Sequence, residues 1–268
     1  MSLLHFSRWF KANSSRPFSL VFALGGEIEK EFQDLAPTWA DERCHWFPGG
    51  LRAQAMRAID LGSLAQRAER AELRKFASSA RPALIYLNGF AATNFRLVEM
   101  LDLRVPMLAH VHGLGLMFRK EAGSAMPRML SASRRFIACS EAVKENLIHH
   151  EVASDKVEVV HESIAVGNVR ASRSRVDVLR ELRFPDDAFL VVGCGLTSWN
   201  KGADVFLELA RHVYSQRNRA HFAWLGPPTA WDIEELKHDA MMAGLADKIR
   251  FTGSVVKTAD YFAAADVF

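Results

Sequence analysis

Short apolar runs alternate with amphipathic stretches along the chain, and this alternation constrains the fold more than any other feature of the sequence. The runs are rich in Val, Ile, Leu and Phe and have the length of strands, whereas the stretches between them carry apolar residues at helical spacing. Strands that alternate with helices form βαβ units around a parallel sheet with both faces covered. The sequence therefore predicts an α/β fold. The expected strands are residues 18–24, 83–87, 105–111, 135–139, 157–161, 188–192, 220–225 and 249–251.

Three of the amphipathic stretches are expected to be helices: residues 51–80, 141–150 and 204–214. In the last of them, apolar residues between Phe206 and Val213 follow the i, i+3, i+4, i+7 pattern of a helix with one buried face. Ser140 stands directly before the second helix, where a hydroxyl side chain accepts a hydrogen bond from a free backbone N–H. We therefore expect Ser140 to be a helix N-cap rather than a nucleophile.

An Arg/Ser-rich stretch, residues 166–185, interrupts the strand–helix rhythm. We interpret it as a linker with a short helix between two domains, residues 1–165 and 166–268, because domain boundaries fall in polar segments of this kind. One continuous sheet with a long crossover is the alternative. The arginines of this stretch are expected to lie on a solvated helix rather than to bind phosphate or lipid. They are Arg170, Arg173, Arg175, Arg180 and Arg183.

The charge and cysteine content exclude several classes of protein. Lys and Arg number 34 against 31 Asp and Glu, so a net charge of +3 gives no indication of a nucleic-acid partner. Cys44, Cys139 and Cys194 form no CxxC pair, which excludes a cysteine zinc module. The longest uncharged run, residues 105–118, is too short to cross a membrane as a helix, and no secretory signal is present. We expect a cytoplasmic protein, and peripheral association with the cytosolic face of a membrane stays open.

The segment FLVVGCGLTSWNKGADVFLELA, residues 189–210, joins a strand to a helix through a glycine loop. Gly193 and Gly195 end the strand, and Lys201 stands where the helix begins. Backbone N–H groups and the positive end of a helix favour an anion at such a junction, and a lysine adds a charge suited to phosphate. The segment therefore predicts a diphosphate site, with a purely structural glycine turn as the alternative.

Two common nucleotide motifs do not fit this loop. The dinucleotide fingerprint GxGxxG needs glycine at position 198, which is Ser198, and an acidic residue at the end of the next strand. That strand ends in Trp224-Leu225-Gly226-Pro227 and has no carboxylate. The Walker pattern is also absent, because Lys201 precedes its glycine. We therefore discount NAD and P-loop nucleotides.

A second candidate site is the histidine loop VPMLAHVHGLGL, residues 105–116. His110 and His112 are two positions apart at the end of a predicted strand, so they face the same side of the sheet. Contact with a substrate and a structural role are both open. A metal pair is the weakest interpretation, because no third His, Asp or Glu ligand stands at a telling spacing.

A third segment, residues 251–268, ends a strand and enters a short helix through Ser254, Val255 and Val256. By itself it is a generic βαβ connection. In this order, however, the three segments resemble the family 4 (group 1) glycosyltransferases of the GT-B fold. The similarity extends from residue 18 to residue 268. It includes LIYLNGFAATNF before VPMLAHVHGLG, the stretch RRFIACSEAVKENLIHHEVASDKVEVVHESI, the Trp-x-Lys-Gly-x-Asp turn, AWLG and IRFTGSV.

The resemblance implies two Rossmann-like domains facing across a cleft, an acceptor side at residues 1–165 and a nucleotide-sugar side at residues 166–268. It implies transfer of a hexose, with retention and without a metal, from a nucleotide diphosphate sugar to a saccharide or lipid-linked acceptor, as in polysaccharide biosynthesis. His112 would contact the transferred sugar near the reacting centre. The implied donor-binding residues are Gly193, Gly195, Asn200, Lys201, Ser254, Val255 and Val256.

Three departures from the family pattern shape further expectations. Asn200 precedes Lys201 where the family commonly has Arg, so one positive charge on the diphosphate is missing. The family's first strand would precede Phe18, and its Glu-x7-Glu segment would follow Phe268. We therefore expect a chain truncated at both ends, with an incomplete C-terminal domain and an open sheet edge at residues 266–268. A catalytically inactive GT-B remnant or nucleotide-binding module is the alternative function.

Overall fold

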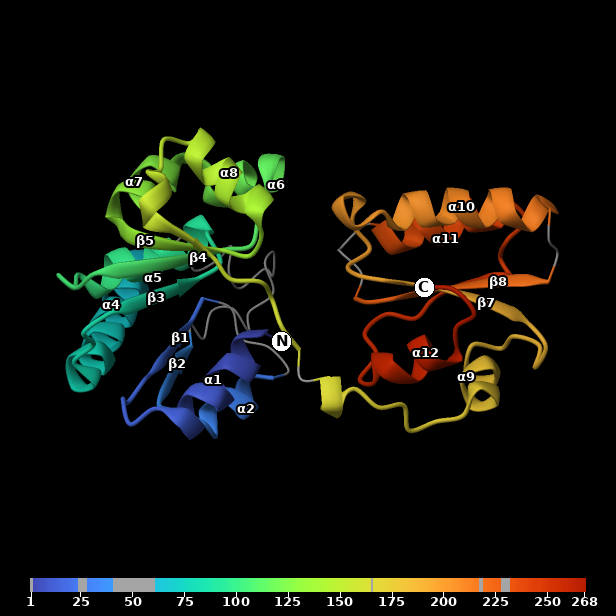
Figure 1. Ribbon diagram of the computed structural model, residues 1–268, viewed down its shortest axis with the longest axis horizontal. Helices are drawn as coiled ribbons and strands as arrows, with labels where there is room; N and C mark the ends of the chain where they lie inside the picture. Colours follow the sequence, from blue (N-terminus) through green and yellow to red (C-terminus); the bar gives the residue numbers. More distant parts are fainter. Residues whose placement is uncertain (1, 24–27, 41–60, 165, 217–218, 228–231) are drawn as a thin grey trace. The chain divides into compact units, whose positions relative to one another are not determined.

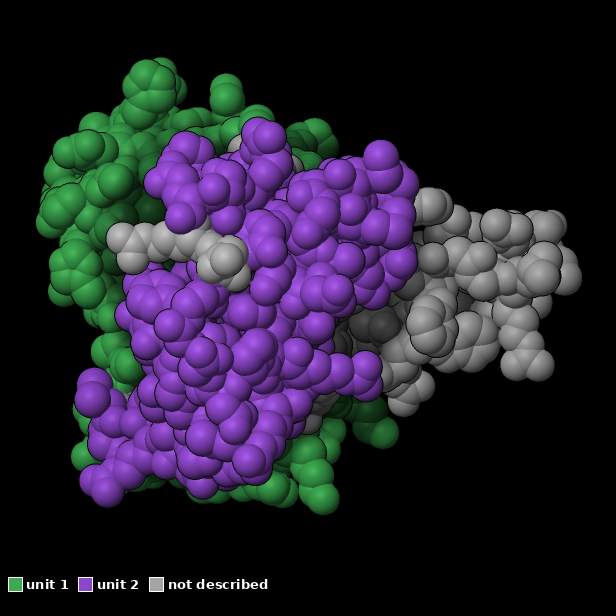
Figure 2. Space-filling model, turned by 90° about the vertical axis from the view of Figure 1, so that its right-hand side faces the viewer, with its two compact units in different colours: residues 1–164 green, residues 165–268 purple. Residues whose placement is uncertain are grey.

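The computed structural model describes residues 2–23, 28–40, 61–164, 166–216, 219–227 and 232–268. The chain divides into two compact units, Met1–Ile164 and Ala165–Phe268, which Figure 2 shows in different colours. Each unit contains parallel strands with helices packed against them (Figure 1). All three sheets are parallel, as the alternating pattern predicts. No helix in the described ranges is long and apolar enough to cross a membrane.

Unit 1 is built on the four-stranded sheet β3-β4-β5-β6, with a separate two-stranded sheet β1-β2. The strands are β1 (Leu20–Phe22), β2 (Thr38–Ala40), β3 (Ile85–Asn88), β4 (Met107–Val111), β5 (Ser133–Ala138) and β6 (Val157–Val159). The helices are α1 (Ser2–Asn13), α2 (Glu29–Gln33), α4 (Leu61–Ala80), α5 (Ala92–Leu101), α6 (Gly115–Ala122), α7 (Met126–Ala132) and α8 (Glu141–His149). The expected strands of this half are all present, and β2 is an addition that its three residues were too short to predict.

Two apolar clusters hold unit 1 together. The larger one lies beneath α6, α7 and α8, and its buried members include Phe118, Met129, Phe136 and Leu147. The smaller one joins α4 and α5 to the β1-β2 sheet. Helix α8 begins where the sequence predicts, because the Ser140 hydroxyl accepts a hydrogen bond from the Val143 N–H over 3.3 Å. Of the long helix expected at residues 51–80, the part from residue 61 onward is helical, and residues 51–60 lie outside the described residues.

Unit 2 is a three-stranded sheet in the order β7-β8-β9. Its strands are β7 (Phe189–Cys194), β8 (Ala220–Leu225) and β9 (Ile249–Phe251). Its helices are α9 (Arg175–Glu181), α10 (Ala203–Gln216), α11 (Asp232–Met242) and α12 (Thr258–Ala264). Helices α10 and α11 cover one face, and α9 and α12 cover the other (Figure 1). The central strand β8 is buried along its whole length, as a strand covered on both faces must be.

The Arg/Ser-rich stretch differs from its predicted form. We expected a solvated linker helix, but α9 packs against the sheet, with Val178 and Leu179 fully buried. Arg175 donates to the Ala188 carbonyl over 2.7 Å and forms an ion pair with Asp266. The prediction was wrong because the apolar residues of this stretch are few and its arginines dominate its composition. The apolar residues Val178, Leu179, Leu182 and Phe184 belong to the core of unit 2, whereas the side chains of Arg170, Arg180 and Arg183 are exposed, as expected.

Residues 266–268 were expected to begin a strand at an open sheet edge. They make a single parallel bridge, in which Val267 pairs with Val191 of β7, as a strand that begins beside β7 would do. The Val192 N–H donates to the Val267 carbonyl over 2.9 Å, and the Leu190 N–H donates to the Asp266 carboxylate over 2.7 Å. This part of the chain therefore covers the side of β7 that does not face β8.

Candidate functional site

The carboxyl ends of β7, β8 and β9 meet at one edge of the unit 2 sheet, because the three strands are parallel neighbours. The Gly195 N–H donates to the Leu225 carbonyl, and the Gly226 N–H donates to the Gly253 carbonyl, each over 2.9 Å. The loop after β7 therefore lies beside the turn after β8, and this turn lies beside the loop that leads to Ser254. In open parallel sheets, ligands bind outside such carboxyl edges.

Glycine at this edge is required by close backbone and ring contacts. A Cβ at Gly226 would lie 2.0 Å from the Gly195 carbonyl oxygen, and the φ angle of Gly226 is +141°. A Cβ at Gly193 would lie 2.6 Å from the ring of Trp224. The indole N–H of Trp224 in turn donates to the Gly195 carbonyl over 2.9 Å. Gly193 therefore has a packing role irrespective of any ligand.

Lys201 ends the 3-10 turn Trp199–Lys201, and Gly202 separates it from α10. The Lys201 N–H donates to the Ser198 carbonyl over 2.9 Å, and Gly202 adopts a φ of +76° that lets the chain turn into the helix. The Lys201 side chain starts next to Gly195, since a Cβ built on that glycine would lie 3.3 Å from the Cβ of Lys201. The side chain is exposed, and it forms no ion pair with another described residue. Lys201 thus offers an uncompensated charge above the glycine loop.

Asn200 has a fixed orientation beside this lysine. The Ser198 hydroxyl donates to the side-chain oxygen of Asn200 over 2.5 Å. The oxygen of the amide is therefore engaged, which leaves its NH2 group as a donor. Between Gly195 and Gly202 the sequence contains one cation, Lys201. The loop accordingly offers a charged donor, Lys201, and a neutral donor, the NH2 group of Asn200, to an anion.

The three residues of the loop after β9, Ser254, Val255 and Val256, lie in different environments. Val255 packs against the apolar cluster that α9 and α12 share, whereas Ser254 and Val256 are exposed. Val255 therefore anchors the loop, and its two neighbours present a hydroxyl and an isopropyl group at the surface. Lys257 follows at the entry to α12.

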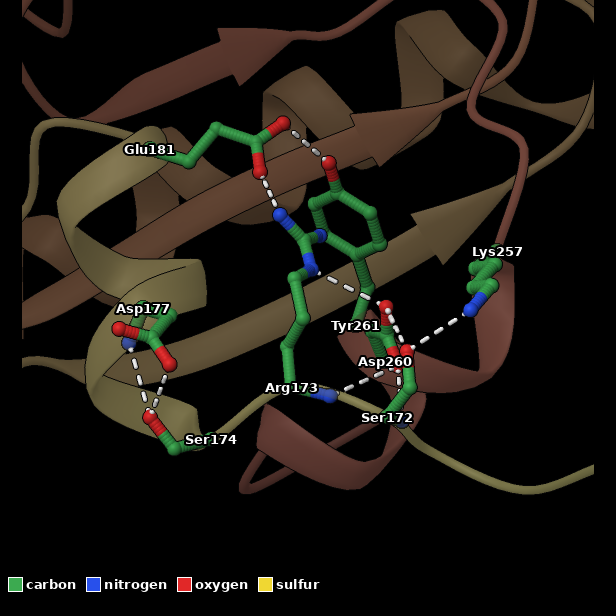
Figure 3. A network of polar contacts seen from close by, with 8 residues as sticks. All are labelled: Ser172, Arg173, Ser174, Asp177, Glu181, Lys257, Asp260 and Tyr261. Atoms are coloured by element: carbon green, nitrogen blue, oxygen red, sulfur yellow. Dashed lines mark hydrogen bonds and ion pairs between the residues drawn. The ribbon is translucent and has the colours of Figure 1, made fainter.

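A network of polar contacts ties the entry of α12 to the start of unit 2 (Figure 3). Lys257 donates to the Ser172 hydroxyl over 3.1 Å. The carboxylate of Asp260, which is only 1% exposed, accepts from the Ser172 N–H over 2.6 Å and from Nε of Arg173 over 3.0 Å. These bonds, the backbone one from Ser172 first, lower the pKa of Asp260. The network thus fixes the chain directly after Val256.

The network continues from Arg173 to α9. Arg173 also pairs with Glu181, and the Tyr261 hydroxyl donates to Glu181 over 2.6 Å (Figure 3). The Glu181 contact is the main cause that raises the pKa of Arg173. Arg173 and its neighbours therefore connect α9 with α12, the two helices on one face of the sheet. This explains why an arginine in a segment that we expected to be solvated is held in place.

In unit 1, the predicted histidines lie at the carboxyl edge of the four-stranded sheet. His110 is the penultimate residue of β4, and His112 follows the strand. Their ring centroids are 4.1 Å apart. Nδ1 of His112 lies 2.7 Å from Oε1 of Glu162, and Nε2 of His112 lies 2.9 Å from Oδ1 of Asn88. His112 is thus held between two oxygen atoms, one from the end of β3 and one from the segment after β6.

His110 is the more buried of the two, with a side chain only 13% exposed. Nδ1 of His110 lies 2.5 Å from the Tyr86 hydroxyl, and Nε2 lies 4.0 Å from Oε1 of Glu162. Burial, with a smaller effect of His112, lowers the pKa of His110 to about 4, and burial raises the pKa of Tyr86 to about 12. Both groups are therefore neutral near pH 7. Nε2 of His110 has no hydrogen-bond partner in the described part of the chain.

Glu162 is the residue that sequence reasoning missed. We discounted a metal pair because no third ligand stood near His110 and His112 in the sequence, but the fold brings Glu162 to them from the segment after β6. The sheet order β3-β4-β5-β6 places the ends of these strands at one edge. The signal was a polar residue shortly after each strand, Asn88 and Glu162 included. To infer from these residues that Glu162 lies near His110 and His112, one must know the order of the strands in the sheet, which the sequence alone does not give.

Both units match known protein families. Residues 21–166, more than half of the chain, match the model of Glycosyltransferase Family 4, and residues 187–268 match the model of Glycosyl transferases group 1. A D-inositol 3-phosphate glycosyltransferase of Streptomyces scabiei is 29% identical over 150 residues. That match covers 52% of this chain and 34% of the relative, so the chain matches about a third of the relative's length.

Solved structures share the fold at low identity. HepE of Anabaena, solved with UDP and glucose, has a TM-score of 0.67 and 17% identity, and the match covers 92% of this chain and 72% of HepE. A putative UDP-N-acetylglucosamine 2-epimerase of Listeria monocytogenes has a TM-score of 0.61 and 11% identity, over 99% of this chain and 68% of that one. Because the identities are only 17% and 11%, these neighbours show the shared GT-B architecture of two Rossmann-like units and no particular chemistry. With its first unit matched to the family model, the chain belongs to glycosyltransferase family 4.

Proposed function

We propose that the protein transfers a hexose from a nucleotide diphosphate sugar to a saccharide or lipid-linked acceptor, with retention of the anomeric configuration. The observation that carries this proposal is the carboxyl edge of unit 2, where Lys201 extends from the turn before α10, beside Gly195. Membership of the glycosyltransferase family supports it. So do the UDP complexes of the structural neighbour HepE.

The donor diphosphate binds above the loop between Gly195 and Gly202 in this proposal. Lys201 supplies a charge-assisted hydrogen bond, and the side-chain NH2 of Asn200 supplies a neutral one. Ser254 and Val256 contact the nucleobase, and the partly buried Val255 keeps their loop in place. Gly193 contributes indirectly, because it allows Trp224 to hold the Gly195 carbonyl.

His112 contacts the transferred sugar near its anomeric carbon. In a retaining transfer the acceptor hydroxyl attacks this carbon on the face from which the nucleotide diphosphate leaves. The bond from carbon to the leaving phosphate oxygen breaks, the bond to the acceptor oxygen forms, and the acceptor's proton passes to the leaving phosphate. The protein then contributes orientation and stabilisation of the developing charge rather than a covalent nucleophile. No resident metal enters this scheme.

Titration calorimetry with UDP and GDP tests the donor site. The Lys201→Ala variant loses one charge-assisted contact, worth about 1.5–3 kcal/mol, so its affinity should fall about tenfold to a hundredfold. Lys237→Ala is the matched control, because Lys237 is an exposed lysine of α11 paired with Glu234. Equal affinity of wild type and Lys201→Ala would contradict the proposed role of the loop.

A catalytically inactive nucleotide-binding module is the second candidate. The observation that favours it is Asn200, which leaves Lys201 as the single cation of the loop. An assay with a panel of nucleotide sugars and saccharide or lipid-linked acceptors separates the two. Nucleotide binding together with turnover supports the transferase. Binding that depends on Lys201, without turnover of any donor in the panel, supports the inactive module.

A further inference from the structure

We propose that the amino edge of the four-stranded sheet in unit 1 holds an anion site, which binds a ligand with phosphate groups. The site is an open cavity of about 730 Å³ beside the starts of β4, β5 and β6. Four cationic side chains line it: Arg104, Arg134, Arg135 and Lys156. The inference concerns unit 1 alone and does not rest on the proposed transferase activity.

This cavity lies at the opposite end of the sheet from the histidine loop. Because the strands are parallel, their starts meet at one edge of the sheet and their ends at the other. Pro106 lines the cavity and directly precedes β4, whereas His112 directly follows that strand. At about 3.3 Å per residue, the strand holds these two residues roughly 20 Å apart. A ligand in the cavity is therefore separate from any sugar that His112 contacts.

A β-bulge brings two neighbouring arginines to this cavity. In a regular strand, successive side chains point to opposite faces of the sheet. Met107 of β4 pairs with Ser133 of β5. The next residue of β4, Leu108, pairs with Arg135, so the register shifts and Arg134 is the extra residue of a bulge. Arg134 and Arg135 are both exposed and both line the cavity. Bulges redirect side chains in this way and often lie beside functional sites.

The positive charges of the cavity are not balanced by the residues around it. None of the four cations forms an ion pair with another described residue. Asp155 is the one carboxylate among the lining residues, so four cations and one anion leave an excess of three positive charges. A concave surface lined by one sign of charge concentrates ions of the opposite sign. The cavity therefore attracts an anion with more than one negative charge.

Arg135 is oriented by a neighbour and still has donors to offer. Its Nη1 donates to the Asp155 carbonyl over 3.0 Å, which places the guanidinium beside the turn before β6. A guanidinium carries five N–H donors, so most of them stay available for a ligand. The start of β5 is fixed as well, because the buried Ser133 hydroxyl donates to the Met129 carbonyl over 2.8 Å. The arginines thus extend from a backbone that is held on both sides.

The kind of cation selects the class of anion. Three of the four cations are arginines, whose planar guanidinium donates two parallel hydrogen bonds to the oxygen atoms of a phosphate. A single carboxylate engages one guanidinium, whereas a ligand with several phosphate oxygens engages more than one. The cavity volume also lies in the range of about 300–1,000 Å³ that is common for small-molecule sites. A soluble organic phosphate and a phospholipid head group share this chemistry.

The experiment uses the full chain and two probes, one for each source of phosphate. Pyrophosphate is the soluble probe in titration calorimetry. Because pyrophosphate also fits the proposed donor loop, the titrations use the Lys201→Ala chain. We expect one pyrophosphate per chain, with an affinity that falls as salt is added. Sedimentation with phosphatidylglycerol vesicles, compared with phosphatidylcholine vesicles, shows whether a lipid head group also binds.

Variants show whether the cavity is the place of binding. Arg104→Gln and Arg134→Gln, each added to Lys201→Ala, remove one cation from the lining and should weaken binding about threefold to tenfold. Arg119→Gln is the matched control, because Arg119 is an exposed arginine of α6 that does not line the cavity. Arg104 and Arg134 are exposed, so both variants should fold, and thermal unfolding curves verify this before the titration.

The outcomes are distinguishable. Weaker binding of either probe in Arg104→Gln and Arg134→Gln, with binding unchanged in Arg119→Gln, supports the site, and the probe that binds identifies the source of the phosphate. Binding of neither probe, or an equal loss in Arg119→Gln, would overturn it. In chains that keep Lys201, the two cavity variants should leave the affinity for UDP unchanged. A failure of this test is therefore separate from a failure of the donor site, since the two sites lie in different units.

Discussion

The two units place polar groups at the carboxyl edges of their sheets by different means. In unit 2 the edge is made by backbone: glycines allow three loops to approach one another, and their N–H groups donate to carbonyls of neighbouring loops, with one lysine exposed beside them. In unit 1 the edge is made by side chains, because His110, His112, Asn88 and Glu162 come from three different segments. The comparison shows that one architecture supports a contiguous loop site and a site assembled across strands. The two should therefore respond differently to substitution.

The largest effect is expected at the backbone-built edge, in Gly226→Ala. The new Cβ would lie 2.0 Å from the Gly195 carbonyl oxygen, and alanine would have to adopt a φ of +141°. Neither can be relieved by rotating a side chain, so we expect a loss of more than about 3 kcal/mol in the free energy of unfolding. Denaturant unfolding followed by circular dichroism measures this.

Two controls sharpen this result. Gly244→Ala also places alanine at a positive φ, +71°, but its Cβ meets nothing within 4 Å. It should cost only about 1–2 kcal/mol. Glu162→Gln at the side-chain-built edge removes a partly exposed ion pair with His112 and should cost less than about 1 kcal/mol. If Gly226→Ala is no more damaging than Gly244→Ala, the close contact with Gly195 does not constrain the edge.

The next effect concerns the network that fixes the loop after β9, and it depends on pH. The pKa of Asp260 lies below its ordinary value of 3.8 because Ser172 and Arg173 bind the carboxylate. Folding therefore favours the ionised form. The ionised Asp260 carboxylate makes its full contribution to stability above the pKa that Asp260 has in the unfolded chain. This contribution is lost as the pH falls through the lower pKa that Asp260 has in the folded state. Asp260→Asn should consequently have a lower free energy of unfolding than wild type at neutral pH. This difference in free energy should shrink below about pH 4.

Urea unfolding at a series of pH values measures the Asp260 effect. Asp186→Asn is the control in the same unit, because Asp186 is 61% exposed and lies 3.9 Å from its partner Arg180. Its difference from wild type should be small and nearly independent of pH. If the free energies of unfolding of wild type and Asp260→Asn differ by the same amount from neutral pH to pH 3, the charge of the Asp260 carboxylate does not contribute to stability.

The same contrast explains how much could be predicted from the sequence. The strands of unit 2 and the loop with Lys201 follow from a contiguous pattern, since strand, glycines, lysine and helix occur within one short segment. Helix α8 was placed for the same reason, with Ser140 as its cap. Local rules describe such features because their contacts are local.

What the sequence left out depends on contacts between distant segments. Glu162 meets His112 only because β6 lies in the same sheet as β4, and Arg173 meets Asp260 only because α9 packs beside α12. The Arg/Ser-rich stretch was misread for this reason, since nothing near Arg173 in the sequence indicates a buried carboxylate partner. Polar residues acquire their roles from neighbours that the topology brings together.

The smallest effect is a gain at the backbone-built edge. The loop carries one cation, and Asn200 occupies the position where the family commonly has arginine. Asn200→Arg adds a guanidinium next to Lys201, but the site is exposed and water screens the new contact, so about 1 kcal/mol is the most that we expect. Affinity for UDP or GDP should rise about threefold to fivefold in titration calorimetry, and the gain should shrink with added salt. Asn200→Gln, which lengthens the side chain without charge, should give no gain. Since the proposed transfer draws on the same loop, weaker nucleotide binding in Asn200→Arg would place the diphosphate away from residue 200 and limit the site to Lys201 and the backbone.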